Sequence, residues 1–549
     1  MEITDIKIRK MMNEGRLRAV VSITIDNALA VHDIKLIQGD ERLFVAMPSR
    51  RDENGIFRDI VHPITADVRE KIEEKLLAAY RMNLLYNELS ELVVTKKAEI
   101  IHDLAELVEV SSVMGEPEEG APFGREPRRA LDIMQKLCDK AGFTTTVYGD
   151  AVLCADYAPY GADIELGILA HLDVVPVERD NWDTDPFKLT EKDGVLYGRG
   201  TIDDKGPAVA ALWALKCVKE LLVPLKKGVR LIFGTNEENG SHDLEIYKKY
   251  DKFPPRVFTP DGSFPVINAE KGMMRSNFKA ELDGNGSIVS FEGGKIPNAV
   301  PDKARAVLSD VPIDKVRSAI AEDNSGAAFA ASENTDGVEI VCKGRAAHAS
   351  TPESGINAIT ALISLINRLP IADGKQRDVL KGLEEIFPFG ETDGASCGMK
   401  CADEIGALTL VLSIFKMDRN SCGATLDSRF PSCLKQYDME EKENAAMHCA
   451  GMELVGYMCD EAHIVPKNDE FVKTLLKVYE DSEGEPGRCI AIGGGTYVHN
   501  IKGGVAFGAE RGDTDYHMHG DNEFITVDEL LKDAALFAKA IVRICGENR

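Results

Sequence analysis

The sequence predicts an α/β fold: a sheet domain with helices on both faces, an α+β domain inserted into it, and a small α+β domain in front. Short apolar runs alternate with helical segments beyond about residue 85, which is typical of an α/β sheet. Polar hairpins interrupt this alternation from about Gly272, and strand-like patterns fill residues 1–65. We therefore divide the 549 residues into 1–82, 83–271, 272–460 and 461–549, with the second and fourth parts forming one domain.

The N-terminal part combines strands with the start of a helical region. Residues 18–25 and 43–49 have strand composition, and Asn54-Gly55 is a strong hairpin signal. From Asp67 the apolar spacing becomes helical, and this tendency continues to about Ser111. The boundary near Met82 rests on content alone, because no spacer rich in Pro, Gly or Ser separates the parts. Two explanations for the presence of both parts in one sequence stay open: a genuine fusion protein, or two adjacent genes whose sequences have been joined.

Three short apolar runs in the following part are predicted to be buried strands. They lie at 166–170, 229–233 and 256–260, with a helix at 207–222 between two of them, which indicates a mainly parallel sheet. The inserted domain is expected to contain a helix that starts at Thr351, with Pro352 in its first turn. Helices at 470–482 and 528–544 complete the sheet domain.

Composition limits the classes of function. Residues 1–82 hold as many basic as acidic side chains, so the net charge of −26 belongs to the remainder, which is a poor candidate for binding polyanions. The 12 cysteines are scattered without a C-x-x-C pair, which favours reduced thiols. The sequence has no run of about 18 apolar residues, and its first residues are charged, so we expect a cytoplasmic protein without membrane partners.

Metal-ligating residue types follow the predicted strands. His171 and Asp173 follow the first strand, Glu237 and Glu238 the second, and Asp261 the third. Ligands in open α/β sheets collect beyond the carboxyl ends of strands. Two further candidates are Asp203, in the turn GRGTIDDKGP, and His519 near the C-terminus. Each alone is more often a surface or turn residue, but together they suit a pair of divalent metal ions, zinc or manganese.

Several motifs carry a family resemblance. HLDVVP (171–176), GRGTIDDKGP (198–207), GTNEENGS (234–241), FTPDGSFPVINAEKG (258–272), GRAAHASTPESGINA (344–358), GGGTY (493–497) and MHGDNE (518–523) occur in this order. Over roughly residues 85–549 the chain resembles the di-zinc aminopeptidase/aminoacylase superfamily, and within it the PepV-like dipeptidases.

This resemblance implies a role for each candidate residue. Glu237 would be the general base for a metal-bridging hydroxide, and Asp173 would hydrogen-bond His171. The peptide bond after Asp203 is expected to be cis. The metal ligands would be His171 and Asp261 on one ion, Glu238 and His519 on the other, and Asp203 between them. His517 competes with His519, which we choose because M-H-x-x-N-E matches the family.

The inserted domain would supply substrate contacts as a lid. By resemblance, His348 stabilises the developing oxyanion, and Asn298 and Arg429 contact the substrate. The alternative for Arg429 is a surface ion pair. The backbone N–H groups of the glycine-rich segment that includes Gly494, Gly495 and Thr496 could hold a substrate carboxylate.

The segment 1–82 resembles a different family. MEITDIKIRK, ITIDNALAVHDIKLI, LFVAMPSRR and GIFRDIVHPI are similar to the septation regulator SpoVG. That resemblance implies a homodimer that binds RNA or DNA, with Arg50 and Arg51 as contacts. The alternative is that both arginines are solvated residues of a hairpin.

The combined prediction is a metal-dependent dipeptidase joined to a SpoVG-like nucleic-acid-binding module. An N-acyl-amino-acid deacylase would share the metal ligands. A regulatory nucleic-acid-binding protein that uses the peptidase part as a scaffold is the alternative from another class.

Overall fold

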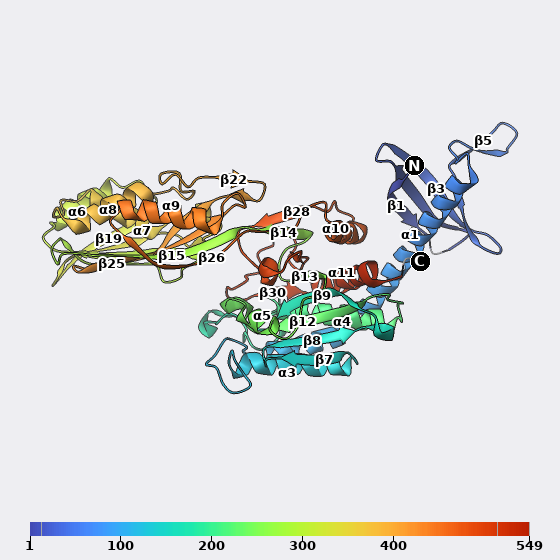
Figure 1. The fold of residues 1–549 in the computed structure, drawn as a ribbon, viewed down its shortest axis with the longest axis horizontal. Coiled ribbons are helices and arrows are strands. Elements are labelled where there is room, and N and C mark those ends of the chain that lie inside the picture. The colour runs from blue at the N-terminus through green and yellow to red at the C-terminus, as the bar shows by residue number, and fades with distance from the viewer. Residues whose placement is uncertain (13, 513, 548–549) are drawn as a thin grey trace. The chain divides into compact units, whose positions relative to one another are not determined.

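The computed structural model describes residues 1–12, 14–512 and 514–547. The chain forms two compact units, Met1–Pro255 with Asp513–Arg549, and Arg256–Gly512 (Figure 1). Within the described residues, no helix combines the length and apolar character needed to cross a bilayer.

The N-terminal strands form an antiparallel sheet packed on one helix. Its order is β1-β2-β3-β4, and a separate hairpin of β5 and β6 follows. Gly55 at the tip of the hairpin has a φ of 81°, as expected for Asn-Gly. The bounds are β1 Ile3–Met11, β2 Leu17–Ile25, β3 Leu29–Gln38, β4 Leu43–Ala46, β5 Ser49–Arg51 and β6 Phe57–Asp59.

Helix α1, Ala66–Thr95, is continuous through the predicted boundary at residue 82. Its first half contributes Ile72, Leu76 and Tyr80 to the core of the N-terminal sheet. Its second half buries Leu89 and Val93, and the helix contacts α4 and α11. One amphipathic helix therefore serves two cores, which explains why the sequence offers no spacer here.

The rest of the first unit is a sheet with four of its strands in the order β9-β12-β8-β7. β9 and β12 are parallel, whereas β8 pairs antiparallel with both β12 and β7, so the sheet is mixed rather than mainly parallel. Helices α4 and α11 contact β9 and β12, and α3 contacts β7 and β8. The bounds are α2 Lys97–Val108, α3 Arg125–Lys140, β7 Thr144–Tyr148, β8 Val152–Tyr157, β9 Ile164–His171, β10 Thr190–Lys192, β11 Val195–Tyr197, α4 Lys205–Glu220, β12 Gly228–Gly234, α5 His242–Tyr247, β30 Phe524–Thr526 and α11 Val527–Cys545.

The second unit contains two main groups of strands and two short two-stranded sheets. In the first, β14 pairs with β27, β28 and β29, and β13 pairs with β29. The second is an eight-stranded sheet in the order β19-β20-β18-β16-β24-β25-β15-β26. The bounds of the first group and its helix are β13 Arg256–Thr259, β14 Val266–Glu270, β27 His463–Ile464, α10 Glu470–Glu483, β28 Cys489–Ile492 and β29 Val505–Ala506.

The eight-stranded sheet, together with α6–α9, makes up the part of the chain that was predicted to be an inserted lid, and its role as a lid stays a prediction. Helices α6–α9 gather on one side of its strands (Figure 1), and α7 is buried nearly all round against β18, β20 and β24. The bounds are β15 Gly272–Glu281, β16 Ile288–Gly293, β17 Ala299–Val300, β18 Lys303–Leu308, α6 Ile313–Ala321, β19 Ala328–Asn334, β20 Gly337–Lys343, β21 Ala347–His348, α7 Ala358–Asn367, α8 Lys375–Ile386, β22 Ala402–Asp403, β23 Gly406–Ala407, β24 Thr409–Met417, β25 Ser421–Phe430, α9 Gln436–Cys449 and β26 Glu453–Asp460.

One helix start was predicted wrongly. Pro352 begins only a single 3₁₀ turn, which ends at Ser354, and α7 starts at Ala358. Asn357 caps α7, since its side-chain oxygen accepts the N–H groups of Ile359 and Thr360. The cap that forms is thus six residues further along the chain than the one predicted.

Candidate active site

Two parallel strands of the first unit deliver candidate residues to one edge. β9 ends at His171, β12 ends at Gly234, and these two residues are register partners. The segment after β12 forms a 3₁₀ turn, Glu237–Asn239, that carries Glu237 and Glu238. Asp243 accepts hydrogen bonds from the N–H groups of Thr235 and Asn236, which fixes the chain just before the glutamates.

Two imidazoles and two carboxylates of this unit lie in direct contact. Asp203 Oδ1 lies 2.9 Å from His171 Nε2, and Asp203 Oδ2 lies 2.8 Å from His519 Nε2. His519 Nε2 is also 3.2 Å from Glu238 Oε1. Ligand atoms of His171, Asp203 and Glu238 all lie within 4.8 Å of one another, a spacing at which one cation could be held. The predicted choice of His519 therefore fits the geometry, whereas His517 Nδ1 contacts the Asp521 carbonyl.

The ionisation of this cluster follows from burial and mutual contact. Burial opposes the charge of Asp203, but hydrogen bonds with His171 and His519 lower the pKa of its carboxyl well below the usual range. Burial and the charge of Asp203 raise the pKa of Glu238. Burial also opposes the His519 cation, but its hydrogen bonds to Asp203 and Glu238 raise the pKa of the imidazole to about 11. The carboxylates of Asp203 and Glu238 thus favour a positively charged group between them.

Asp173 contacts His171 as predicted, but through its main-chain carbonyl more closely than through its carboxylate. His171 Nδ1 lies 3.0 Å from the main-chain carbonyl of Asp173, and 3.5 Å from its carboxylate Oδ1. The fully buried carboxylate instead accepts the backbone N–H groups of Glu237 and Glu238, at 3.1 Å each. The carbonyl therefore holds the proton on Nδ1, and the carboxylate positions both glutamates.

The turn that carries Asp203 is held by residues that sequence reasoning missed. Glu523 is fully buried and accepts the N–H groups of Gly200 at 2.9 Å, Ile202 at 3.0 Å and Asp203 at 3.3 Å. It also pairs with the buried Arg199 at 2.6 Å. Glu523 belongs to the quoted motif MHGDNE, but its partners lie more than 300 residues away in the sequence, so no local pattern identifies its role.

The backbone at this turn has the predicted form. The Asp203–Asp204 peptide bond is cis. Asp204 accepts the N–H of His171 at 3.0 Å, which ties the turn to the end of β9. Asp261, the remaining predicted ligand, lies in the second unit, just beyond β13, and its role as a ligand stays a prediction.

The predicted substrate residues come together in the second unit. β17 pairs with β21, so that the carbonyl of Asn298 accepts the N–H of Ala349 beside the exposed His348. His348 Nδ1 contacts Ser350 Oγ at 2.7 Å. Gly493 packs so closely on Ser350 that a Cβ on the glycine would lie 2.6 Å from the Ser350 Cβ.

Arg429 on β25 adjoins the same glycine-rich segment. Its Nη1 donates to the Gly493 carbonyl at 3.2 Å, and its Nε donates to Asp427 at 2.7 Å. Arg429 is only 5% exposed, so the alternative of a surface ion pair is wrong. The backbone N–H of Thr496 donates to Glu270, while the contacts of Gly494 and Gly495 with substrate stay predictions.

Comparison with known proteins decides the family. Residues 167–543, more than half of the chain, match the model of peptidase family M20/M25/M40, and residues 1–82 match the SpoVG model. The chain belongs to peptidase family M20/M25/M40. It is therefore an enzyme, and the M20 match includes the turn of Asp203 and both glutamates.

Relatives of this M20 peptidase match over most of its length. It is 34% identical over 466 residues to the Bacillus subtilis (strain 168) protein named "Putative dipeptidase YtjP", covering 82% of this chain and 98% of that protein. It is 32% identical over 480 residues to the Beta-Ala-Xaa dipeptidase of Lactobacillus delbrueckii subsp. lactis, covering 85% and 100%. Human carnosine dipeptidase 1 has the same fold, with a TM-score of 0.54 at 15% identity over 84% of this chain and 98% of that chain.

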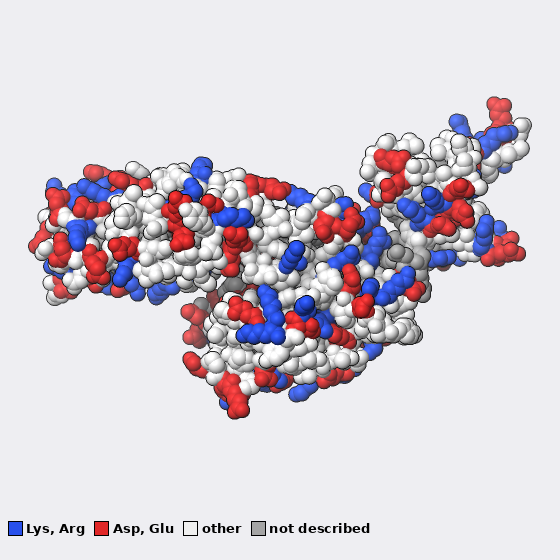
Figure 2. Space-filling view, viewed as in Figure 1, with Lys and Arg blue, Asp and Glu red and all other residues white. Residues whose placement is uncertain are grey.

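The N-terminal hairpin of this M20 peptidase exposes the two predicted arginines. Arg50 and Arg51 lie on β5, and Arg51 Nε donates to the carbonyl of Gly55 at 2.9 Å. Figure 2 shows acidic and basic side chains interspersed over the visible face of the N-terminal sheet. The arginines are thus accessible, and their contact with nucleic acid stays a prediction.

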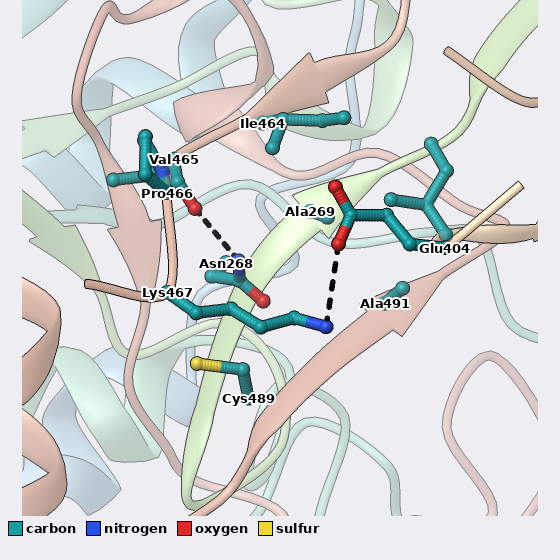
Figure 3. Close-up of a pocket in the computed structure, with 10 residues that line it drawn as sticks. Asn268, Ala269, Glu404, Ile464, Val465, Pro466, Lys467, Cys489 and Ala491 are labelled. Carbon is teal, nitrogen blue, oxygen red and sulfur yellow. Dashed lines mark hydrogen bonds and ion pairs between the residues drawn. The ribbon is translucent and has the colours of Figure 1, made fainter. Parts of the chain in front are cut away.

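A small pocket in the second unit is lined by none of the predicted site residues. It is lined by residues of β14, β27 and β28, of the segment after β27 and of the turn between β22 and β23 (Figure 3). Asn268 Nδ2 donates to the Val465 carbonyl at 2.7 Å, and Lys467 pairs with Glu404 at 3.5 Å. The first contact joins β14 to the segment after β27, the second joins that segment to the turn between β22 and β23, and neither involves a metal ligand predicted from the sequence.

Proposed function

We propose that the chain is a metal-dependent dipeptidase. The observation that carries this proposal is the contact among His171, Asp203, Glu238 and His519. Two buried carboxylates this close repel each other unless a cation lies between them. Imidazole nitrogen and carboxylate oxygen are common ligand atoms of zinc, and carboxylate oxygen also suits manganese. The residues therefore fit a pair of divalent ions.

Each residue then has a role. His171 and Asp261 would hold one ion, Glu238 and His519 the other, and Asp203 would bridge them. Such ions polarise a carbonyl group and lower the pKa of water towards ~7. We assign the general base to Glu237, because its neighbour Glu238 already contacts His519 in the cluster. Glu237 would accept a proton from the attacking water and pass it to the leaving amine. Asp173 keeps both glutamates in place through their backbone N–H groups.

Substrate binding would fall to the second unit. His348 would donate to the oxygen of the tetrahedral intermediate, and Asn298 and Arg429 would orient the substrate. Gly494 and Gly495 would receive the carboxylate of the dipeptide through their N–H groups. The two named dipeptidase relatives, each matched over more than four fifths of this chain, support a dipeptide as substrate.

Hydrolysis of a small substrate panel tests this function. Protein stripped of metal with a chelator is expected to be inactive, and zinc or manganese should restore cleavage of Ala-Ala or β-Ala-His but not of N-acetyl-Met. Preferential cleavage of N-acetyl-Met would favour a deacylase instead. Metal binding without cleavage of any of the three would contradict the dipeptidase proposal.

We also propose that residues 1–82 form a homodimerising module that binds RNA or DNA. The SpoVG match and the exposure of both arginines on β5 support this proposal. The double variant Arg50→Ala/Arg51→Ala is expected to weaken binding on the order of tenfold and to reduce the salt slope, because each contact with a phosphate releases about one counterion. An electrophoretic shift titration over a range of salt concentrations measures both effects.

Arg16→Ala is the matched control for the arginine variant. Arg16 is 75% exposed in the same sheet domain and pairs with Asp40 rather than lying on the hairpin. If the double variant Arg50→Ala/Arg51→Ala binds nucleic acid with wild-type affinity, or if it and Arg16→Ala lose affinity equally, Arg50 and Arg51 are not the specific contacts. A wild-type protein that shifts no RNA or DNA at low salt would end the nucleic-acid proposal itself.

A further inference from the structure

We propose that Glu270 and His499 position the glycine segment 493–496 and thereby set the preference of the enzyme for a free substrate carboxylate. This inference rests on the proposed dipeptidase function and names residues that determine its specificity. Glu270 is the last residue of β14, and His499 follows the glycine segment in the 3₁₀ turn Tyr497–Asn500. We define the loop lock as Glu270, Thr496 and His499.

A fully buried carboxylate lies at the centre of the loop lock. Glu270 Oε1 accepts the hydroxyl of Thr496 at 2.8 Å, and Oε2 accepts the backbone N–H of Thr496 at 3.3 Å. Glu270 Oε2 also lies 2.7 Å from His499 Nδ1. Burying a carboxylate is costly unless it is paired and hydrogen-bonded, and these three contacts meet that condition.

The contacts of His499 define its charge. Its side chain is 9% exposed, and Nε2 lies 2.9 Å from the main-chain carbonyl of Glu461. A carboxylate and a carbonyl oxygen only accept hydrogen bonds, so both ring nitrogens must donate, and the ring is an imidazolium. Burial opposes this charge, but the hydrogen bond to Glu270 outweighs it and raises the pKa of His499. The loop lock is therefore a buried ion pair.

The glycine segment is held at both ends. Arg429 binds the Gly493 carbonyl, and Glu270 binds Thr496. Between them, a Cβ on Gly495 would lie 3.5 Å from His499 Nδ1 and 3.7 Å from Glu270 Oε2, so this backbone rests against the ion pair. Glycine loses more backbone conformational entropy on ordering than any other residue. Because both ends of the segment are already fixed, less entropy is lost when the substrate binds.

The loop lock also changes which N–H groups face the substrate. The amide of Thr496 is engaged by Glu270, so the amides assigned to the substrate carboxylate are those of Gly494 and Gly495. A dipeptide whose carboxylate is replaced by an amide gains little from this preorganisation. The ratio of kcat/KM for a free dipeptide to kcat/KM for its amide therefore reports the effect of the loop lock on carboxylate binding.

The test compares Glu270→Gln and His499→Gln with the control His463→Gln. The ring of His463 lies 6.2 Å from that of His499, but its Nε2 contacts the Gly504 carbonyl rather than the loop lock. In both loop-lock variants we expect KM for Ala-Ala to rise about tenfold, as for the loss of one hydrogen bond to a charged group, with kcat within about threefold. The kcat/KM for Ala-Ala amide should stay at the wild-type value, and the control should match wild type throughout.

Hydrogen exchange of the peptide that contains residues 493–500 supplies a readout independent of activity. We expect faster exchange there in both loop-lock variants and wild-type exchange in the control. Unchanged exchange, or an equal loss of kcat/KM on both substrates, would overturn the positioning role. If the wild-type protein cleaves neither substrate, the dipeptidase proposal fails and the specificity role fails with it, while faster exchange would still support the loop lock as a structural device.

Discussion

Replacing Glu237 with glutamine is expected to lower kcat for Ala-Ala by about 10²–10⁴-fold, the usual contribution of a general base. Glutamine keeps the shape of the side chain but cannot accept the proton. Folding and metal content should not change, since Asp173 holds this residue through its backbone N–H. Steady-state kinetics and metal analysis on the same preparation measure the two effects separately.

Glu245→Gln provides the matched control for the base. Glu245 lies on α5, eight residues further along the chain, and its side chain is 69% exposed. It should retain full activity. A Glu237→Gln enzyme within about threefold of wild type would contradict the assignment of the base, because even a weak general base contributes more than that. Loss of metal in this variant would instead identify Glu237 as a ligand.

Replacing Asp203 with asparagine is expected to remove most of the bound metal. It should also lower kcat/KM by at least about 10³-fold, because polarisation of the substrate carbonyl and activation of water are lost together. The carboxylate contacts both His171 and His519, so one substitution disturbs both sides of the cluster. Metal content measured by mass spectrometry after dialysis, together with kcat/KM for Ala-Ala, tests this expectation.

Asp180→Asn separates this effect from a general loss of negative charge. Asp180 is an exposed aspartate of the same unit, in the 3₁₀ turn Arg179–Asn181. Its variant should keep full metal content and activity. Two equivalents of metal retained by Asp203→Asn would show that Asp203 does not bridge the ions.

The ends of the apolar runs predicted much of the candidate site. His171 and Glu237 follow runs whose strand character is plain from composition, and the parallel pairing of β9 and β12 brings both to one edge. The choice between His517 and His519 also came from a motif. Each of these predictions depends on a few consecutive residues, which is why a sequence can offer it at all.

Residues that act across long sequence distances could not be predicted. Glu523 reaches the turn of Asp203 from the other end of the chain, and Glu270 meets His499 only when β14 and the glycine segment are adjacent. The predicted contact between Asp173 and His171 is present, but a sequence does not show whether the carbonyl or the carboxylate of Asp173 lies nearer to the imidazole. Thr351 was a locally good cap, but Asn357 has the better position relative to the buried face of α7.

Helix α1 couples the folding of the N-terminal sheet to that of the helices α4 and α11, on which its second half packs. Turns that bury Ile72 and Leu76 in the N-terminal core continue directly into turns that bury Leu89 and Val93. A helix propagates by adding one hydrogen bond for each residue fixed, so order in one half lowers the cost of order in the next. Any ligand that stabilises residues 1–82 would therefore also stabilise the turns of α1 that pack on α4 and α11, so that binding to the N-terminal part and folding of the sheet domain are linked thermodynamically.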